Sequence, residues 1–215
     1  MPSFTVESWW VDHLSQGGGG SGAEKNEVVQ QGITVAGYTS DSANGRGGTL
    51  VVYGEPPNVC ELGANGQPNE SGDVVWRLTD ENQDSYEAAL KRSVKANLKL
   101  SATDALPVSN LDDIKAALGD GNYSKVVYIG HSMNYGDGTG ILIPSAQTVS
   151  GTELAGVLPA SVKDVYFIGC DPSGVAAQAA AAAPGVNFHG AGNLLNQNVI
   201  FNSSQQVIRI TFSPQ

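Results

Sequence analysis

The chain is poor in the residues that build disulfide frameworks and metal sites. It has two cysteines, Cys60 and Cys170, and three histidines among 215 residues. Two cysteines cannot form the several bridges that hold small secreted domains together, although a single bridge between them stays open. No Cys-x-x-Cys or His-x-x-x-His spacing occurs in the sequence. We therefore expect no metal site and no cofactor.

Positive charge is scarce as well. The chain has 11 Lys+Arg residues against 21 Asp+Glu residues, which gives a formal net charge of −10. Binding to phosphate backbones takes clustered positive charge, so we expect no nucleic-acid partner. The acidic surplus is compatible with a basic partner or substrate, and it is more typical of a charge that keeps a protein soluble.

Long apolar runs and a leader sequence are both missing. No run approaches the roughly 20 apolar residues that a membrane-spanning helix needs, and no charged-then-apolar leader is visible. A chain of 215 residues with 40% hydrophobic residues is typical of a soluble globular protein with a sizeable core. We therefore expect no membrane span and no signal peptide.

The first 22 residues differ in composition from the rest of the chain. Residues 17–22, Gly-Gly-Gly-Gly-Ser-Gly, have the composition of a flexible, engineered linker. We therefore divide the chain into a fused or displaced peptide (1–16), the linker (17–22) and a single domain (23–215).

The peptide ahead of the linker contains two of the three tryptophans, Trp9 and Trp10. Val6, Trp10 and Leu14 recur at the spacing of a helical stripe, with Thr5 available as a cap. Aromatic anchors on a short amphipathic helix are typical of a groove-binding peptide. Trp9, Trp10 and Leu14 would then anchor an intramolecular ligand, derived from a partner and tethered to raise its effective concentration. A native N-terminal element, joined after a loop deletion, is an equal alternative.

The order of apolar and amphipathic segments predicts an α/β fold with a mainly parallel central sheet flanked by helices, plus a β-rich N-terminal part. A glycine-rich hairpin loop at 44–48 and a longer loop at 55–72 separate the first strands. The expected strands are 33–38, 50–53, 73–78 (with Trp76 in the core), 126–129, 141–143, 164–168, 186–188 and 207–212. The expected helices are 80–97, capped by Thr79 or Asp80 and buried along Tyr86, Leu90, Val94 and Leu98, then 111–118, capped by Asn110, 152–158 and 175–183.

Two of these strands organise the chain, because each ends in a glycine and is followed by a reactive side chain. Strand 126–129 leads through a glycine to His131, and strand 164–168 leads through a glycine to Cys170. Open α/β sheets place their ligands outside the carboxyl ends of the strands. An imidazole and a thiol at two such ends indicate a nucleophilic Cys/His site.

Ser132 is the alternative nucleophile. Residues 130–134, Gly-His-Ser-Met-Asn, nearly match the Gly-x-Ser-x-Gly elbow of α/β-hydrolases, and Asp171 and His189 follow in the order that a Ser, Asp, His triad has there. The fifth position is asparagine instead of glycine, however. The next six residues, 135–140, contain three glycines and cannot sustain the helix that the elbow needs. A glycine-rich hairpin is expected instead.

Cys170 has the more favourable surroundings. The alanine-rich helix predicted at 175–183 follows it closely, Pro172 suits the first turn and Asp171 is a candidate cap. A thiol at or just before a helix N-terminus favours the thiolate form. His131 could then serve as its general base or as its imidazolium partner.

With this order of strand-His, glycine-rich hairpin, helix and strand-Cys, the chain resembles the caspase-like (clan CD-type) cysteine peptidases. It looks most like the cysteine protease domains of large bacterial toxins and the related gingipain- and clostripain-type enzymes. The motifs Tyr128-Ile-Gly-His131 and Phe167-Ile-Gly-Cys170 carry the resemblance, which covers 126–212 well and the preceding βα units loosely. The resemblance implies a three-layer caspase-like sandwich that acts on a peptide or protein substrate, as a processing or effector domain located in the bacterial cytoplasm or secreted.

The resemblance also implies roles for single residues. His131 and Cys170 would form the catalytic dyad, and backbone N–H groups around Ser132 and Gly169 would form the oxyanion hole. Ser132 departs from the glycine that usually follows the histidine in this family. Toxin domains of this type are activated by inositol hexakisphosphate on a basic surface, and the few, scattered cations of this chain argue against that cofactor.

Three further residues are candidate neighbours of the site, and each also has a plain structural interpretation. Asp171 fits a helix cap, His189 fits a strand end beside the site, and Asp137 fits a turn, where Asp-Gly is common. Two other functions stay open beside the cysteine endopeptidase. One is an inactive caspase-like module that docks the Trp-Trp peptide, and the other is a serine esterase that uses Ser132.

Overall fold

The computed structural model describes most of the domain and one short piece of the N-terminal peptide. The described residues are 5–6, 47–54, 59–60, 75–76, 78–119, 122–135, 139–190, 195–202 and 204–214. The expected strand 33–38, the linker 17–22, the anchors Trp9, Trp10 and Leu14, and Asp137 all lie outside these residues.

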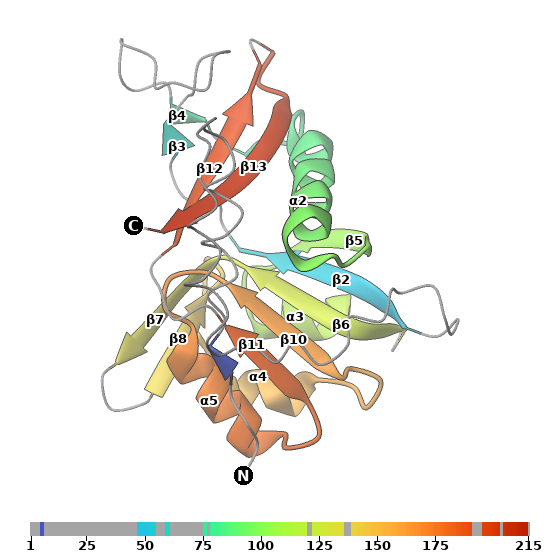
Figure 1. Cartoon of the computed structure of the whole chain (residues 1–215), viewed down its shortest axis with the longest axis vertical. Helices are drawn as coiled ribbons and strands as arrows, with labels where there is room; N and C mark the ends of the chain where they lie inside the picture. Colours follow the sequence, from blue (N-terminus) through green and yellow to red (C-terminus); the bar gives the residue numbers. More distant parts are fainter. Residues whose placement is uncertain are drawn as a thin grey trace, which may run out of the picture.

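A six-stranded sheet in which every neighbouring pair is parallel forms the centre of the molecule (Figure 1). The predicted α/β fold, with a parallel central sheet flanked by helices, is therefore confirmed. In spatial order the strands are β1 (Thr5–Val6), β11 (Asn187–Gly190), β10 (Asp164–Ile168), β6 (Tyr123–Ile129), β2 (Gly48–Tyr53) and β5 (Ala102–Pro107).

The strand order creates a natural ligand position. Counted along the chain, the five strands β2, β5, β6, β10 and β11 lie side by side in the order second, first, third, fourth, fifth. The direction of winding therefore reverses between β2 and β6. Tyr53 is level with Ile129, and Ile129 is level with Ile168, so β2, β6 and β10 end together. Sheets of this type bind ligands beyond the carboxyl strand ends at such a reversal.

Side chains that alternate along the strands build one core on each face of the sheet. Val51 and Tyr53 belong to the first core, whereas Leu50 and Val52 belong to the second. This alternation follows from the two-residue period of a strand and explains the nearly continuous apolar runs in the sequence.

Different elements cover the two faces (Figure 1). The first core lies under α2 (Gln83–Leu98) and the antiparallel hairpin of β12 (Leu195–Phe201) and β13 (Val207–Pro214). The second lies under α3 (Leu111–Ala117), α4 (Gly151–Val157) and α5 (Ser173–Ala182). The result is three layers with the sheet in the middle. Among the described residues, no helix is long and apolar enough to cross a membrane.

Helix α2 shows the predicted buried stripe but begins later than expected. Tyr86, Leu90, Val94 and Leu98 are all buried at a spacing of four residues, which is the period of one helix face. Neither Thr79 nor Asp80 is the cap, because the N-cap residue is Asn82.

The chain before α2 forms a turn instead of a first helical turn. The N–H of Thr79 donates to the side-chain oxygen of Asn82 at 2.9 Å, and its carbonyl accepts from the N–H of Gln83 at 3.0 Å. The expected cap at α3 is confirmed, since Asn110 accepts from the N–H of Asp113 at 2.9 Å.

Two short strands pair in the N-terminal half. β4 (Val75–Trp76) lies within the predicted strand 73–78, and it pairs with β3 (Val59–Cys60), which lies where a loop was expected. Trp76 is a core residue, as predicted. Its ring stacks on Tyr86 at 5.3 Å, and its Nε1–H donates to the carbonyl of Gln205 at 3.2 Å.

The helix predicted to start in the N-terminal peptide is wrong at its first residues. Thr5 and Val6 form β1, which pairs in parallel with β11 at the edge of the sheet. Val6 is therefore not the first position of a helical stripe, and Thr5 is not its cap. Pairing with the exposed edge of a sheet outweighs a local periodicity of only three residues.

Truncation of the α2 stripe tests the first core. Leu90 is fully buried, so we expect Leu90→Ala to lower the free energy of unfolding by about 2–5 kcal/mol through lost burial and the cavity left behind. Lys95→Ala, on the exposed side of the same helix, should stay within about 0.5 kcal/mol of the wild type. Urea denaturation measures both values, and similar values for the two variants would contradict the packing described here.

Candidate functional site

The carboxyl ends of β6 and β10 bring the two predicted reactive residues to matching positions. Ile129 and Ile168 are the last paired residues of these strands, and the N–H of Gly130 donates to the carbonyl of Ile168 at 3.0 Å. The parallel ladder therefore continues beyond the strand ends. His131 and Cys170 each follow two residues after this last pair, so both lie just beyond the carboxyl ends of adjacent strands.

Glycine allows these strand ends to approach closely. A Cβ atom on Gly169 would overlap the carbonyl oxygen of Gly130 and would lie 3.0 Å from the Oγ of Ser132. A Cβ atom on Gly130 would lie 2.8 Å from the hydroxyl oxygen of Tyr128. Any larger residue at position 169 must separate the ends of β6 and β10, so glycine is needed at this position.

Ser132 connects the two strand ends through its side chain. Its residue is 8% exposed, and its hydroxyl donates to the carbonyl oxygen of Cys170 at 2.5 Å. Since a peptide unit is planar, this bond fixes the orientation of the peptide that follows Cys170. Ser132 thus acts as a support for the Cys170 segment in this structure.

The predicted hairpin follows His131 directly. β7 (His131–Tyr135) pairs antiparallel with β8 (Thr139–Ile143), which pairs with β9 (Val149–Ser150). A nucleophile elbow needs a helix after its serine, and here Ser132 lies within strand β7. The backbone around Ser132 therefore differs from that of an α/β-hydrolase elbow.

Helix α5 and the hairpin meet at two more glycines. A Cβ atom on Gly140 would overlap the backbone N of Val175, and one on Gly174 would lie 2.7 Å from both Asn134 Oδ1 and the carbonyl oxygen of Thr139. The glycine at position 140 that disfavours a helix therefore also lets β8 pack against the first turn of α5, next to Cys170.

A cluster of three polar side chains holds the turn between Cys170 and α5. The amide Nδ2 of Asn134 donates to Ser173 Oγ at 2.9 Å and to Asp171 Oδ2 at 3.3 Å, and the hydroxyl of Ser173 donates to Asp171 Oδ1 at 2.5 Å. Asp171 has a positive φ of 40°, a left-handed conformation that aspartate tolerates better than most residues. This cluster stabilises the turn that presents Cys170.

The prediction that Asp171 caps α5 is wrong. The N-cap residue is Pro172, without a side-chain cap bond, and Asp171 binds Asn134 and Ser173 instead. Sequence reasoning did not identify Asn134 or Ser173 as part of the site. The only signal for Asn134 was the absence of the glycine that an elbow would have at that position.

Tyr128 binds the backbone of His131 through its side chain. Its ring is buried, and its hydroxyl donates to the backbone carbonyl of His131 at 3.2 Å. Burial raises the pKa of Tyr128, so the phenol stays protonated and remains a donor at neutral pH. Sequence reasoning treated Tyr128 only as part of the motif before His131.

The two reactive side chains are open to solvent to different degrees. His131 is exposed and Cys170 is half-buried. Cys170 forms no disulfide with the part of the chain that the structure describes. Cys170 therefore keeps part of its surface in contact with solvent. Within the described residues, no group of three or more His, Cys, Asp or Glu side chains could hold a metal ion.

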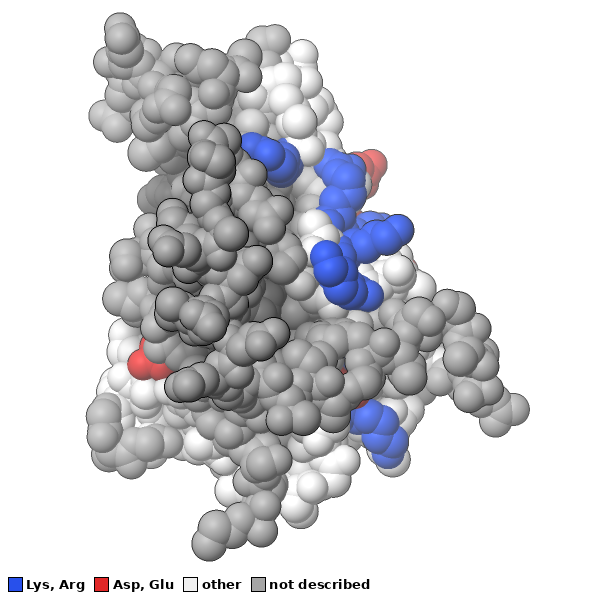
Figure 2. Space-filling model, in the orientation of Figure 1, with Lys and Arg blue, Asp and Glu red and all other residues white. Residues whose placement is uncertain are grey.

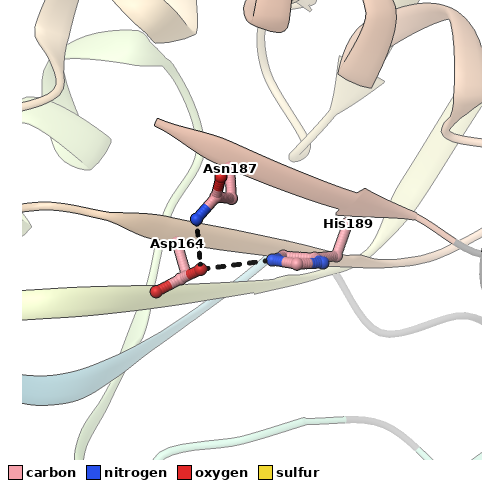
Figure 3. A network of polar contacts seen from close by, with 3 residues as sticks. All are labelled: Asp164, Asn187 and His189. Atoms are coloured by element: carbon pink, nitrogen blue, oxygen red, sulfur yellow. Dashed lines mark hydrogen bonds and ion pairs between the residues drawn. The ribbon is translucent and has the colours of Figure 1, made fainter. Parts of the chain in front are cut away.

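His189 lies away from Cys170, in a network with Asp164 and Asn187 (Figure 3). Its ring stacks on Tyr166 with centroids 4.4 Å apart, and its Nε2 lies 3.3 Å from Asp164 Oδ1. His189 is level with Tyr166, four residues before Cys170 along β10. The histidine is therefore paired with Asp164, and the Ser132, Asp171 and His189 side chains do not form a triad.

Asp164 is held in its charged form by this network. Burial by itself raises the pKa of Asp164, but hydrogen bonds from His189 and Asn187 and the positive charges of His189 and Lys125 outweigh it. The net effect is a pKa below the ordinary value for aspartate. The network connects β10 and β11, since Asn187 also donates to Asp164 at 3.0 Å.

Several Lys and Arg side chains lie together on one face of the molecule. Figure 2 shows them over α2 and the neighbouring β13. Two of them bind backbone carbonyls: Arg92 donates to Ile208 at 3.0 Å, and Lys99 donates to Ala96 at 2.7 Å. Lys95 and Lys99 lie at the C-terminal end of α2, where cations interact favourably with the helix dipole. The residues of this basic strip are Lys91, Arg92, Lys95, Lys99 and Arg209.

Two glycine substitutions with opposite expected signs test the close approach of the strand ends. Gly169→Ala should lower the free energy of unfolding by about 1–3 kcal/mol, because its methyl group would force β6 and β10 apart. Gly156→Ala, in α4 with open space around its Cβ, should raise it by about 0.5–1 kcal/mol through better helix propensity. Denaturation with urea measures both. A neutral Gly169→Ala variant would contradict the described geometry.

Removal of the Asp164 charge should give a pH-dependent loss of stability. We expect Asp164→Asn to lower the free energy of unfolding by about 1 kcal/mol at pH 6.5. Because the folded pKa lies below the unfolded one, the stabilisation is present above about pH 4 and is lost as the pH falls through the folded pKa. The difference from the wild type should therefore shrink as the pH falls below about 4. Asp80→Asn, at an exposed position, is the control, and a difference independent of pH would contradict the role of the charge.

Comparison with known proteins does not add a family to these observations. No protein-family model matches this chain, and no curated protein matches it. The resemblance to caspase-like peptidases therefore rests on the order of the elements and on the positions of His131 and Cys170.

Proposed function

We propose that the protein is a cysteine-type endopeptidase in which Cys170 is the nucleophile and His131 its acid–base partner. The observation that supports this most directly is the register of β6 and β10, in which both residues follow the carboxyl ends of adjacent parallel strands at matching positions. The chain order of His131, hairpin β7–β8, helix α4, strand β10 and Cys170 is also the order expected from the caspase-like resemblance.

The proposed reaction has two steps. The Cys170 thiolate attacks the carbonyl carbon of a peptide, and the C–N bond breaks as the His131 imidazolium donates its proton to the leaving amine. A thioester then joins the acyl part of the substrate to Cys170. In the second step His131 takes a proton from water, the resulting hydroxide attacks the thioester, and the carboxylic acid product leaves as the thiol is regenerated.

Backbone N–H groups near Ser132 and Gly169 are the proposed donors to the oxyanion of each step. The bond from Ser132 to the Cys170 carbonyl and the support of Tyr128 under His131 restrict movement of both segments. One well-placed donor of this kind contributes about 3 kcal/mol to transition-state stabilisation. A role as a processing or effector domain of a bacterial toxin-like protein would follow if the family resemblance holds.

A binding module without catalytic activity is the second candidate. One observation favours it, namely that the N-terminal peptide, which carries Trp9 and Trp10, contacts the domain through the pairing of β1 with β11. The serine-esterase alternative has no such support, because the Ser132 hydroxyl is buried and bound to Cys170. Peptide binding that depends on Trp10, without peptide cleavage by the wild type, would distinguish the module from an enzyme.

Thiol reactivity tests the proposed dyad. We expect brief treatment with iodoacetamide at near-neutral pH to give one fast adduct at Cys170, and His131→Ala to slow this reaction at least about tenfold, because the thiolate loses its imidazolium partner. His189→Ala is the matched control, since His189 pairs with Asp164, and its rate should equal that of the wild type. Intact-mass spectrometry on Cys60→Ala backgrounds measures the rates.

Peptide cleavage completes the test. Active protein should cut substrates from a peptide library, and both Cys170→Ala and His131→Ala should lose this activity while retaining their folded structure. Equal, slow alkylation of the wild type and His131→Ala would overturn the proposal. Labelling of Ser132 by a fluorophosphonate, without labelling of Cys170, would support the serine alternative instead.

A further inference from the structure

The two edges of the central sheet are built differently. β5, at one edge, contains Asp104, ends at Pro107 and pairs with β2 through an irregular register at Thr49 and Leu50. Charge, proline and bulges are features by which proteins prevent an edge strand from pairing further. β11, at the other edge of the domain, has the sequence Asn-Phe-His-Gly and a regular register along β10. It therefore lacks these blocking features and can accept another strand.

The β11 edge is held in place by contacts that do not involve the N-terminal peptide. Phe188 belongs to the second core and stacks on Phe167 with centroids 6.3 Å apart. On the opposite face, His189 stacks on Tyr166 and binds Asp164, which also accepts from Asn187 (Figure 3). Both faces of β11 are thus fixed to β10. An added strand meets a preorganised edge, so binding does not have to order β11 itself.

The strand that occupies this edge comes from the far end of the sequence. Thr5 is level with His189, and Val6 is level with Gly190, in parallel orientation. The described members of both cores all come from residue 50 onward, and the linker 17–22 separates β1 from the domain in the sequence. The position of β1 beside β11 is visible in Figure 1.

We propose that the outer edge of β11 is a docking site for an extended peptide, and that its occupant in this protein is the chain's own N-terminal segment at Thr5–Val6. The peptide binds by strand addition, in which backbone hydrogen bonds provide the affinity. The tether keeps the peptide at a high effective concentration. A free peptide of the same sequence therefore competes poorly for the β11 edge.

The direction of the docked strand gives this site a relation to the candidate active site. β1 runs parallel to β11 and β10, so its carboxyl end points in the same direction as the strand end that precedes Cys170. A peptide that docks on β11 therefore extends toward the carboxyl ends of the strands, where His131 and Cys170 lie. The docking itself does not depend on the proposed peptidase activity, since it uses only the backbone of β11.

Loss of the β1 backbone N–H groups tests the docking in the full chain. Proline has no N–H, and successive N–H groups of a strand point to opposite sides, so Thr5→Pro/Val6→Pro removes whichever of the two donors faces β11. The N–H of Asn187 donates to Lys163 on the β10 side, so we expect those amides of 187–190 that face β1 to exchange with deuterium at least about tenfold faster in this variant, as measured by hydrogen-exchange mass spectrometry. Ser15→Pro, in the same peptide but outside β1, should leave this exchange unchanged. The amides of α2 serve as an internal control for the fold.

A synthetic peptide tests whether the edge accepts a strand in trans. A fluorescent peptide with the sequence of residues 2–12 should bind the double-proline variant and restore slow exchange at 187–190. The same peptide with proline at positions 5 and 6 should not bind. The wild-type chain should bind the peptide at least about tenfold more weakly, because its own tethered strand competes.

Several outcomes would overturn the inference. Unchanged exchange at 187–190 in the double-proline variant would show that β1 does not protect β11, and failure of the peptide to bind that variant would show that the edge is no docking site. A dimer in sedimentation velocity that dissociates on the proline substitutions would assign the strand to a second copy.

If the double-proline variant loses protection in α2, a milder variant replaces it. Thr5→Gly/Val6→Gly retains both N–H groups but has low strand propensity, and it should reproduce a smaller increase in exchange. Normal iodoacetamide reactivity of Cys170 in any of these variants would leave the peptidase proposal intact.

Discussion

The close approach of the carboxyl ends of β6 and β10 is the constraint on which the rest of the site depends. It requires glycine at position 169, because any Cβ there would overlap the Gly130 carbonyl. The bond from Ser132 to the Cys170 carbonyl then joins the two strand ends. Since His131 and Cys170 follow these glycines, their relative position is set by backbone packing before either side chain contributes.

The surrounding elements preserve this arrangement by two further contacts. Helix α5 packs against the hairpin at Gly140 and Gly174, so the turn after Cys170 has little room to move. Asn134, on the hairpin, reaches across to that turn, where Asp171 adopts a left-handed conformation. A strained residue next to a reactive one is common at functional sites, where surrounding contacts hold the unfavourable conformation in place.

Local sequence patterns predicted most helices and strands of the described domain, but not the contacts of single polar residues. The stripe from Tyr86 to Leu98 and the cap at Asn110 follow from spacing and residue type alone, and both are confirmed. Asp171 looked like a helix cap because aspartate commonly precedes helices. Its carboxylate binds Asn134 instead, and that partner lies on a different element, 37 residues away in the sequence.

The sequence by itself determined the central strands β2, β6 and β10 and that a histidine and a cysteine each follow one of them, because the period of apolar residues reports burial along the chain. It did not predict β5 or β12. Only the tertiary structure decided the register of β6 against β10, the pairing of His189 with Asp164, and the placement of Thr5 and Val6 on the edge of β11. These contacts join residues far apart in the chain. Their formation depends on which surfaces meet when the layers pack, and no local periodicity contains that information.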